Sequence, residues 1–185
     1  MKMRAPGLAL LVALAVATPA SALTIAVAAG APQITLRVGQ TGGTISLVTF
    51  TVPAASAGNG VPIDGVSNAA SRAAQAVFPA CAAGVRIWAR ARSTLALPRV
   101  ATLSVNSSGS MISGANSIPF TNIDWVTSGG VEIPSGVFSG AASQNLMTIN
   151  TSNEVSVCLQ YRFLNATVYP AGTYNGQLTY NLAMP

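Results

Sequence analysis

The sequence predicts an all-β protein with the architecture of an antiparallel, immunoglobulin-like β-sandwich. Three observations support this fold class. Apolar and polar residues alternate with a period of two in most of the chain after residue 22. Clusters of Gly, Pro, Ser and Asn separate the alternating segments. Half of the residues are hydrophobic and only 7% are charged, which is typical of a chain that folds around a core rather than of a disordered one.

The alternating segments are expected to be strands with one face toward the core and the other toward solvent. Residues 66–77 differ because they are rich in Ala, and they are expected to form a short helical or loop insertion. We find neither an internal repeat nor a linker, so residues 23–185 are expected to form a single domain. The expected strands are residues 23–28, 33–38, 44–52, 85–92, 100–105, 155–163 and 173–182.

Residues 1–22 have the three parts of a secretory signal peptide. Lys2 and Arg4 are positively charged, residues 8–17 are apolar, and residues 20–22 read Ala-Ser-Ala, which is a typical cleavage site. The apolar run is about half the length needed to cross a bilayer, so it predicts export rather than a transmembrane span. The protein is therefore expected in the periplasm, on the cell surface or outside the cell.

The chain contains two cysteines, Cys81 and Cys158. An exported protein with one pair of cysteines is expected to form a disulfide bond. This bond would restrict the unfolded chain and stabilise the fold by about 4 kcal/mol. The alternative is two free thiols.

The chemistry of the sequence argues against an enzyme. The chain has no His, its only Lys is Lys2, and it lacks the sequence patterns of serine hydrolases and nucleotide-binding loops. We therefore expect no catalytic residues, no metal site and no cofactor. A hydrolase using Asp124 and Glu132, which lie near Trp125, is a remote alternative to a turn and a solvated strand face.

The net charge does not indicate a nucleic-acid partner. After residue 22 the chain carries seven Arg and four acidic residues, a net charge of +3. Four residues stand out, because Arg86, Trp88, Arg90 and Arg92 alternate and would share one face of a strand. This face could bind an anionic glycan or envelope component, or it could be an ordinary outward surface.

Both ends of the expected domain alternate. Residues 23–28 begin with Leu23, Ile25 and Val27, and the last strand runs almost to Pro185 after a Gly-Thr-Tyr sequence at residues 172–174. Here the chain resembles the pilin-like subunits of bacterial chaperone–usher systems, including the archaic type related to the spore coat U domain. The resemblance implies an incomplete sandwich, whose groove is filled by the N-terminal strand of a neighbouring subunit.

The resemblance also implies roles for individual residues and partners. Leu23, Ile25 and Val27 would form the donor strand, and the partners would be other subunits of the same or a related type and a periplasmic chaperone. Alternatively, residues 23–28 pair as an edge strand within their own domain. The function expected is that of a non-enzymatic structural or adhesive subunit of a pilus-like fibre, and the alternative is a self-contained binding module for an anionic glycan or envelope component. The acceptor strand would contain Tyr174, Leu178, Tyr180 and Leu182.

Overall fold

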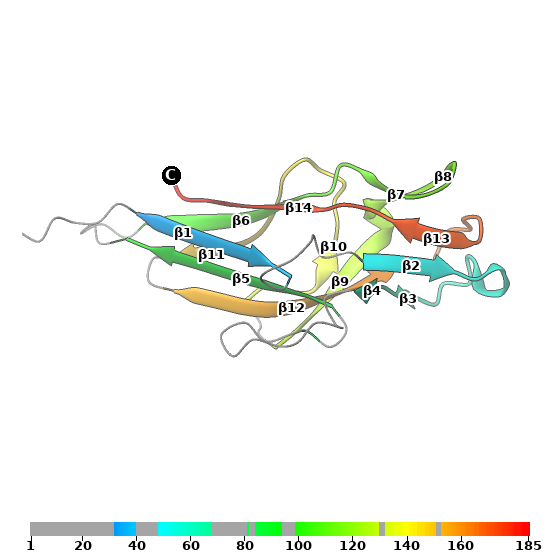
Figure 1. Cartoon of the computed structure of the whole chain (residues 1–185), viewed down its shortest axis with the longest axis horizontal. Coiled ribbons are helices and arrows are strands. Elements are labelled where there is room, and N and C mark those ends of the chain that lie inside the picture. The colour runs from blue at the N-terminus through cyan, green and yellow to red at the C-terminus, as the bar shows by residue number, and fades with distance from the viewer. Residues whose placement is uncertain are drawn as a thin grey trace, which may run out of the picture.

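The described part of the chain forms three antiparallel sheets (Figure 1). The computed structural model describes residues 32–39, 48–67, 81, 84–93, 99–129, 132–150 and 153–185. The expected all-β sandwich is confirmed. The expected signal peptide, residues 1–22, and the expected donor residues Leu23, Ile25 and Val27 lie outside the described residues.

The first sheet, which we call the long sheet, contains the two longest strands of the described chain. Its strand order is β1-β5-β12-β9-β10, and β3 pairs with the far end of β12. Its strands are β1 (Gln33–Val38), β3 (Ile63–Asp64), β5 (Val85–Arg92), β9 (Ile123–Ser128), β10 (Gly136–Val137) and β12 (Glu154–Phe163).

Two further sheets share the last part of the chain. The C-terminal sheet has the order β11-β6-β14, and the short sheet has the order β4-β2-β13-β7-β8. Two short 3-10 turns, Ala54–Ser56 and Phe120–Asn122, lie between strands. The strands are β2 (Val48–Val52), β4 (Val66–Ser67), β6 (Val100–Asn106), β7 (Ser110–Ser113), β8 (Asn116–Pro119), β11 (Gln144–Asn150), β13 (Gly172–Asn175) and β14 (Thr179–Ala183).

One hydrophobic core lies between the sheets and takes residues from all three. The alternation of β12 explains its role, because all its odd-numbered residues from Val155 to Phe163 are buried while the even-numbered ones are not. In β5 the same period buries Val85 and Ile87 together with two small residues, Ala89 and Ala91.

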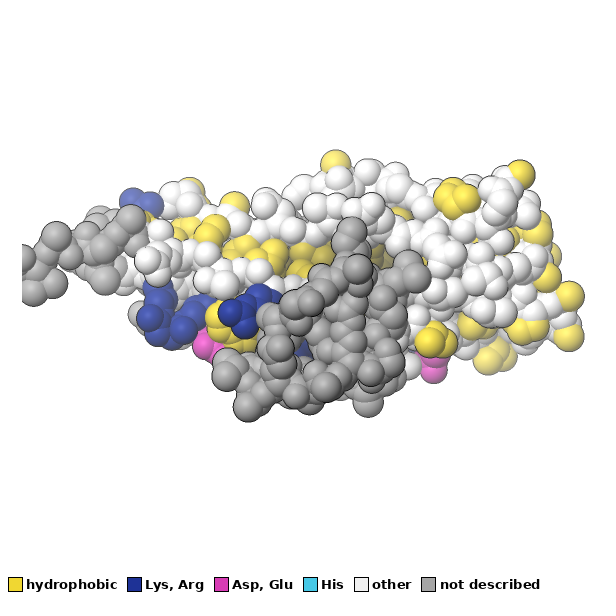
Figure 2. All heavy atoms as spheres, in the orientation of Figure 1, with side chains coloured by type: hydrophobic (Ala, Val, Ile, Leu, Met, Phe, Trp, Pro, Cys, Tyr) yellow, Lys and Arg dark blue, Asp and Glu magenta, His cyan; other side chains and the backbone are white. Residues whose placement is uncertain are grey.

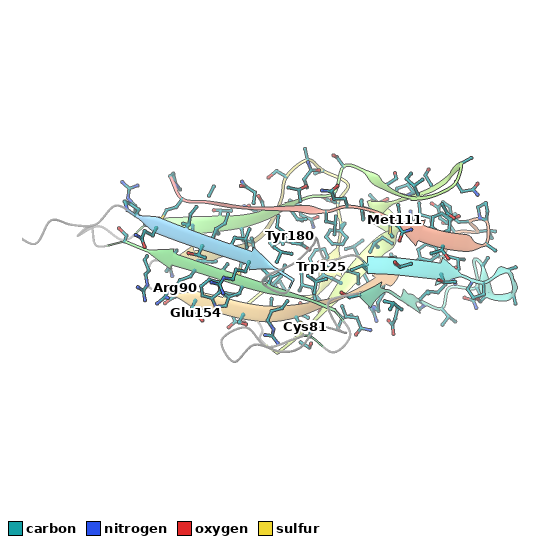
Figure 3. The ribbon with its side chains drawn as sticks, viewed as in Figure 1. Cys81, Arg90, Met111, Trp125, Glu154 and Tyr180 are labelled. Atoms are coloured by element: carbon teal, nitrogen blue, oxygen red, sulfur yellow. A yellow bond between two sulfur atoms is a disulfide. The ribbon has the colours of Figure 1, made fainter. Side chains whose placement is uncertain are left out.

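The disulfide between Cys81 and Cys158 is confirmed. Their Cα atoms are 5.8 Å apart, and the bond joins residues 77 positions apart in the sequence. Cys158 lies in β12 on the face turned away from the core, so the bond fastens Cys81 to the outside of the long sheet (Figure 3). No helix in the described part of the chain is long and apolar enough to cross a membrane.

Two local expectations need correction. Val66 and Ser67, at the start of the expected helical or loop insertion, form strand β4 and pair with β2; residues 68–77 lie outside the described residues. Asp124 and Trp125, expected near a turn, lie inside β9 and pair with β12. β9 is hydrogen-bonded to β12 along one edge and to β10 along the other, so this segment is a central strand of the long sheet and not a turn.

Candidate functional site: an apolar groove beside the last strand

The last strand of the chain is paired unevenly along its length. β13 is bonded to β2 on one edge and to β7 on the other. The chain then crosses at Gly176, Gln177 and Leu178 from the short sheet to the C-terminal sheet. There β14 pairs with β6 on one edge, and its second edge has no strand partner among the described residues.

Strand β1 is the complementary edge. It pairs with β5, and its other edge likewise has no strand partner in the described part of the chain. β1 and β14 lie side by side and run in opposite directions (Figure 1). Two unpaired edges therefore face each other, each with a row of backbone N–H and C=O groups available for a further strand.

The side chains of β1 that should be in the core are only partly covered. Ile34, Leu36 and Val38 lie on the face of β1 opposite to Arg37. Ile34 is 41% exposed and Val38 is 37% exposed, whereas the corresponding residues of the neighbouring β5 are fully buried. Hydrophobic side chains accordingly reach the surface in a band between β1 and β14 (Figure 2). This part of the sandwich lacks covering residues within the described chain.

A cavity of about 570 Å³ continues this band toward the crossing of the last strand. Its walls come from the long sheet, the short sheet and the crossing segment, and they are mostly apolar. We call the cavity and the two facing edges the groove. The lining residues are Val38, Val48, Phe50, Val85, Met111, Phe120, Ile123, Tyr161 and residues 176–180.

Two tyrosines link the sheets across the groove. The hydroxyl of Tyr161, on β12, is hydrogen-bonded to the hydroxyl of Tyr180, on β14. Burial raises the pKa of both phenols well above the usual value, because the charged phenolate would lose its hydration. The pair is therefore neutral at physiological pH and adds an uncharged polar contact to the mostly apolar groove.

The structure divides the expected acceptor residues. Leu178 and Tyr180 line the groove. Leu182 is buried farther along β14. Tyr174 lies elsewhere: it is fully buried in β13, whose two edges are paired, and its hydroxyl donates to the carbonyl oxygen of Pro170. Tyr174 therefore belongs to the core and not to the wall of the groove.

Sequence reasoning did not assign the other walls of the groove. Met111, Phe120 and Ile123 come from segments in which no strand was expected. Gly176 allows the crossing strand to approach them, because a Cβ atom there would lie 2.8 Å from the ring of Phe120 and 2.9 Å from Met111 Cγ. No local pattern signals such contacts, since they join residues more than fifty positions apart.

The groove has to widen before it can hold a strand. Cα atoms of β1 and β14 approach within 8 Å of one another. A strand inserted and paired on both sides would hold them about 9.6 Å apart, which is twice the spacing of neighbouring strands. Insertion would therefore move β1 and β14 apart and bury the apolar band between them.

The Arg86, Trp88, Arg90 and Arg92 side chains lie on the outer face of β5, as expected from their alternation. Although it lies on this outer face, Trp88 is buried, with only 9% of its surface exposed. Its Nε1–H donates to Glu154 Oε1 at 2.7 Å. Arg90 lies beside the second oxygen of Glu154, at 3.9 Å (Figure 3). Arg37 of β1 lies over the Trp88 ring, with its guanidinium carbon 5.2 Å from the ring centroid.

Of the two residues considered for hydrolysis, Asp124 is engaged in an ion pair. Asp124 forms a two-pronged ion pair with Arg162 on the neighbouring strand, in which Arg162 Nε donates to Asp124 Oδ1 at 3.1 Å. This pair raises the pKa of Arg162. Glu132 is exposed and has no such partner among the described residues. Among all the residues that the structure describes, no group of three His, Cys, Asp or Glu side chains is placed to hold a metal ion.

Comparison of the chain with protein-family models, with curated proteins and with solved structures finds no match.

Proposed function

We propose that the protein is a non-enzymatic structural subunit of a bacterial surface fibre, in which a strand from one copy completes the sandwich of the next. The observation that carries this proposal is that β1 and β14 face each other above an apolar cavity, each with one edge that has no strand partner among the described residues. β-Strand addition uses these two features, because edge groups supply hydrogen bonds and pockets receive alternate side chains.

The proposed donor is residues 23–27 of a neighbouring copy. Leu23, Ile25 and Val27 alternate with Thr24 and Ala26, so an extended strand presents the three large apolar side chains on one face. That face matches the apolar walls of the groove. Each such side chain contributes about 1.5–3 kcal/mol when fully buried, and the exposed Ile34 and Val38 of the acceptor would also be covered.

Two further features favour assembly over a solitary role. Only 7% of the residues are charged, which is a low value for a protein surrounded by water. An open apolar groove is also a liability before assembly, because unpaired edges promote aggregation. A periplasmic chaperone that covers β1 and β14 until another subunit arrives is therefore the expected transient partner.

The experiment that tests the proposal compares two donor-strand variants in exported protein. Surface extracts are run on denaturing gels with and without heating, and cells are viewed by electron microscopy. We expect filaments and a heat-sensitive ladder from the wild type. Ile25→Asp should remove both, since it places a charge in the groove.

The matched control is Thr24→Asp, which adds the same charge to the opposite face of the donor strand. It should leave the ladder in place. A wild-type protein that is monomeric without heating, or a ladder that survives Ile25→Asp, would rule out this mode of assembly.

A further inference from the structure

The outer face of the long sheet carries a cationic cluster that the groove does not use. Arg37, Arg90 and Arg92 belong to neighbouring strands, and Arg37 and Arg92 are exposed. Dark blue side chains gather around one magenta side chain on this part of the surface (Figure 2). Five of the seven arginines that follow residue 22 lie on the outer face of the long sheet, the other two being Arg86 and Arg162, and Arg162 is paired with Asp124.

We infer that this face binds an anionic polysaccharide through Arg37, Arg90 and Arg92. The inference goes beyond the proposed assembly, because it concerns the opposite side of the long sheet from the groove. It assigns to the fibre, or to the single subunit, a ligand that carries carboxylate or sulfate groups along a chain.

The register of the sheet places the three arginines at intervals that suit a repeating anion. Arg90 and Arg92 are two residues apart on β5 and face the same way, so their Cα atoms are about 6.6 Å apart. Arg37 is paired with Trp88, which places it diagonally to Arg90 at about 7–8 Å. The cluster therefore offers three separate cations on one face of the sheet.

A scaffold of contacts holds the cluster in place. Glu154 accepts a hydrogen bond from Trp88 and lies beside Arg90, and the Trp88 ring supports Arg37. Trp88 is buried beneath these groups, so it is a support for the cations rather than a platform for a sugar ring. Glu154 is the single acidic side chain at these register positions of β1, β5 and β12, so positive charge remains in excess.

Arg86, on the same face, is hydrogen-bonded within the protein. Its guanidinium donates to Ser156 Oγ at 3.0 Å and to Cys158 Sγ at 3.4 Å. It is thus engaged beside the disulfide bond and is not counted among the ligand-binding groups. The structure narrows the four residues expected from sequence to Arg90 and Arg92 and adds Arg37.

The surroundings favour a hydrated polymer over a membrane. On β1, Gln33 is paired with Arg92 of β5 and Thr35 is paired with Arg90. On β12, Ser156 is paired with Trp88. Hydroxyl and amide groups therefore lie among the cations. The exposed Ile34 and Val38 of β1 point to the other face. A bilayer would need an apolar anchor here, whereas arginine binds carboxylate and sulfate groups through paired hydrogen bonds.

The test uses polygalacturonate as the probe, uncharged dextran as the negative control and the full exported chain as the protein. Binding is measured against salt concentration. The double variant Arg37→Gln/Arg92→Gln should bind about tenfold more weakly and with a smaller salt dependence, since it removes two exposed ion pairs.

Arg99→Gln is the matched control, because it removes one equal charge from the segment before β6, where Arg99 bonds the carbonyl oxygen of Pro185. It should change binding by less than about twofold. Glu154→Gln keeps an acceptor for Trp88 but removes the negative charge, so it should strengthen binding severalfold.

Three results would overturn the inference: unchanged binding by the double variant, an equal loss in Arg99→Gln, or a preference for vesicles of anionic lipid over polygalacturonate. Repeating the measurement with Ile25→Asp separates the two proposals. Binding that persists in that variant while the ladder is absent supports the arginine face independently of how copies assemble.

Discussion

The tyrosine pair shows how single residues define the groove. Tyr161 and Tyr180 come from different sheets, and their hydroxyl groups bond to each other at the groove wall. The hydrogen bond satisfies two polar groups that would otherwise be costly in an apolar site. It also ties β14, whose second edge has no strand partner in the described chain, to the middle of the long sheet.

The first residue-scale prediction concerns alkaline pH. The folded protein holds both phenols protonated, because burial raises the pKa of each, while the unfolded chain ionises near pH 10. A raised pKa in the folded state means that stability is present below pH 10 and falls as the pH rises further. Urea unfolding at pH 8, 10 and 11 should show this fall.

The Tyr161→Phe/Tyr180→Phe variant should be nearly as stable as the wild type at pH 8, because both hydrogen-bonding partners are replaced by apolar rings of the same shape. It should lose less stability than the wild type above pH 10. Tyr169→Phe is the matched control: the Tyr169 hydroxyl accepts from Asn122 Nδ2, and the change leaves the pair intact. An alkaline fall that is equally steep in the double variant would show that the pair is not its source.

Residue roles were harder to predict than residue positions. Alternation placed Arg86, Trp88, Arg90 and Arg92 on one face of a strand, as the structure has them. It did not show that Glu154 holds Trp88 or that Arg37 covers it, because these contacts depend on the register of β1 and β12 against β5. The ion pair of Asp124 with Arg162 was missed for the same reason.

At the scale of elements, strands with unbroken alternation were predicted well. β5 and β12 bury every second residue, and their boundaries differ little from those expected. β11 was missed because a bulge between Asn145 and Met147 interrupts its period. β9 was missed because Asp124, Trp125 and Val126 break a simple alternation in a strand that is covered on both edges.

The last expected strand, residues 173–182, is two strands in the structure. β13 ends at Asn175 and β14 begins at Thr179, and the two belong to different sheets. The division falls at residues 176–178, where the backbone crosses close to Phe120 and Met111. Alternation continues through the crossing, so sequence alone could not separate Tyr174 in the core from Leu178 and Tyr180 in the groove.

An element-scale prediction concerns the start of β5. A Cβ atom at Gly84 would overlap the backbone carbonyl of Leu159, lying 2.8 Å from its carbon, where β5 joins β12. Gly84→Ala should therefore push two central strands apart and lower the free energy of unfolding by about 2–3 kcal/mol.

Gly109→Ala is the control, because its Cβ would meet Phe120 at 3.8 Å, an ordinary contact. Both variants are compared with the wild type by urea unfolding. Equal stability of the two variants would show that the close approach at Gly84 is not required.

Within its described residues, the molecule is a sandwich that is well packed along β5 and β12 and poorly covered between β1 and β14. Its charge is low overall, and the cations that the structure describes on the long sheet lie on the face away from the groove. One side thus suits association with another copy of the chain, and the other side suits an anionic polymer. A fibre would repeat the second side many times and strengthen weak binding by multivalency.

The most direct test of the central claim is whether the groove accepts a strand. A chain that lacks residues 23–30 is mixed with a synthetic peptide of that segment, and thermal unfolding is followed. The peptide should raise the Tm in a concentration-dependent manner, since it binds the folded state, and a peptide with Ile25→Asp should not. A Tm that is unchanged by the wild-type peptide, in a truncated chain as stable as the intact one, would contradict the claim that the sandwich is completed by an inserted strand.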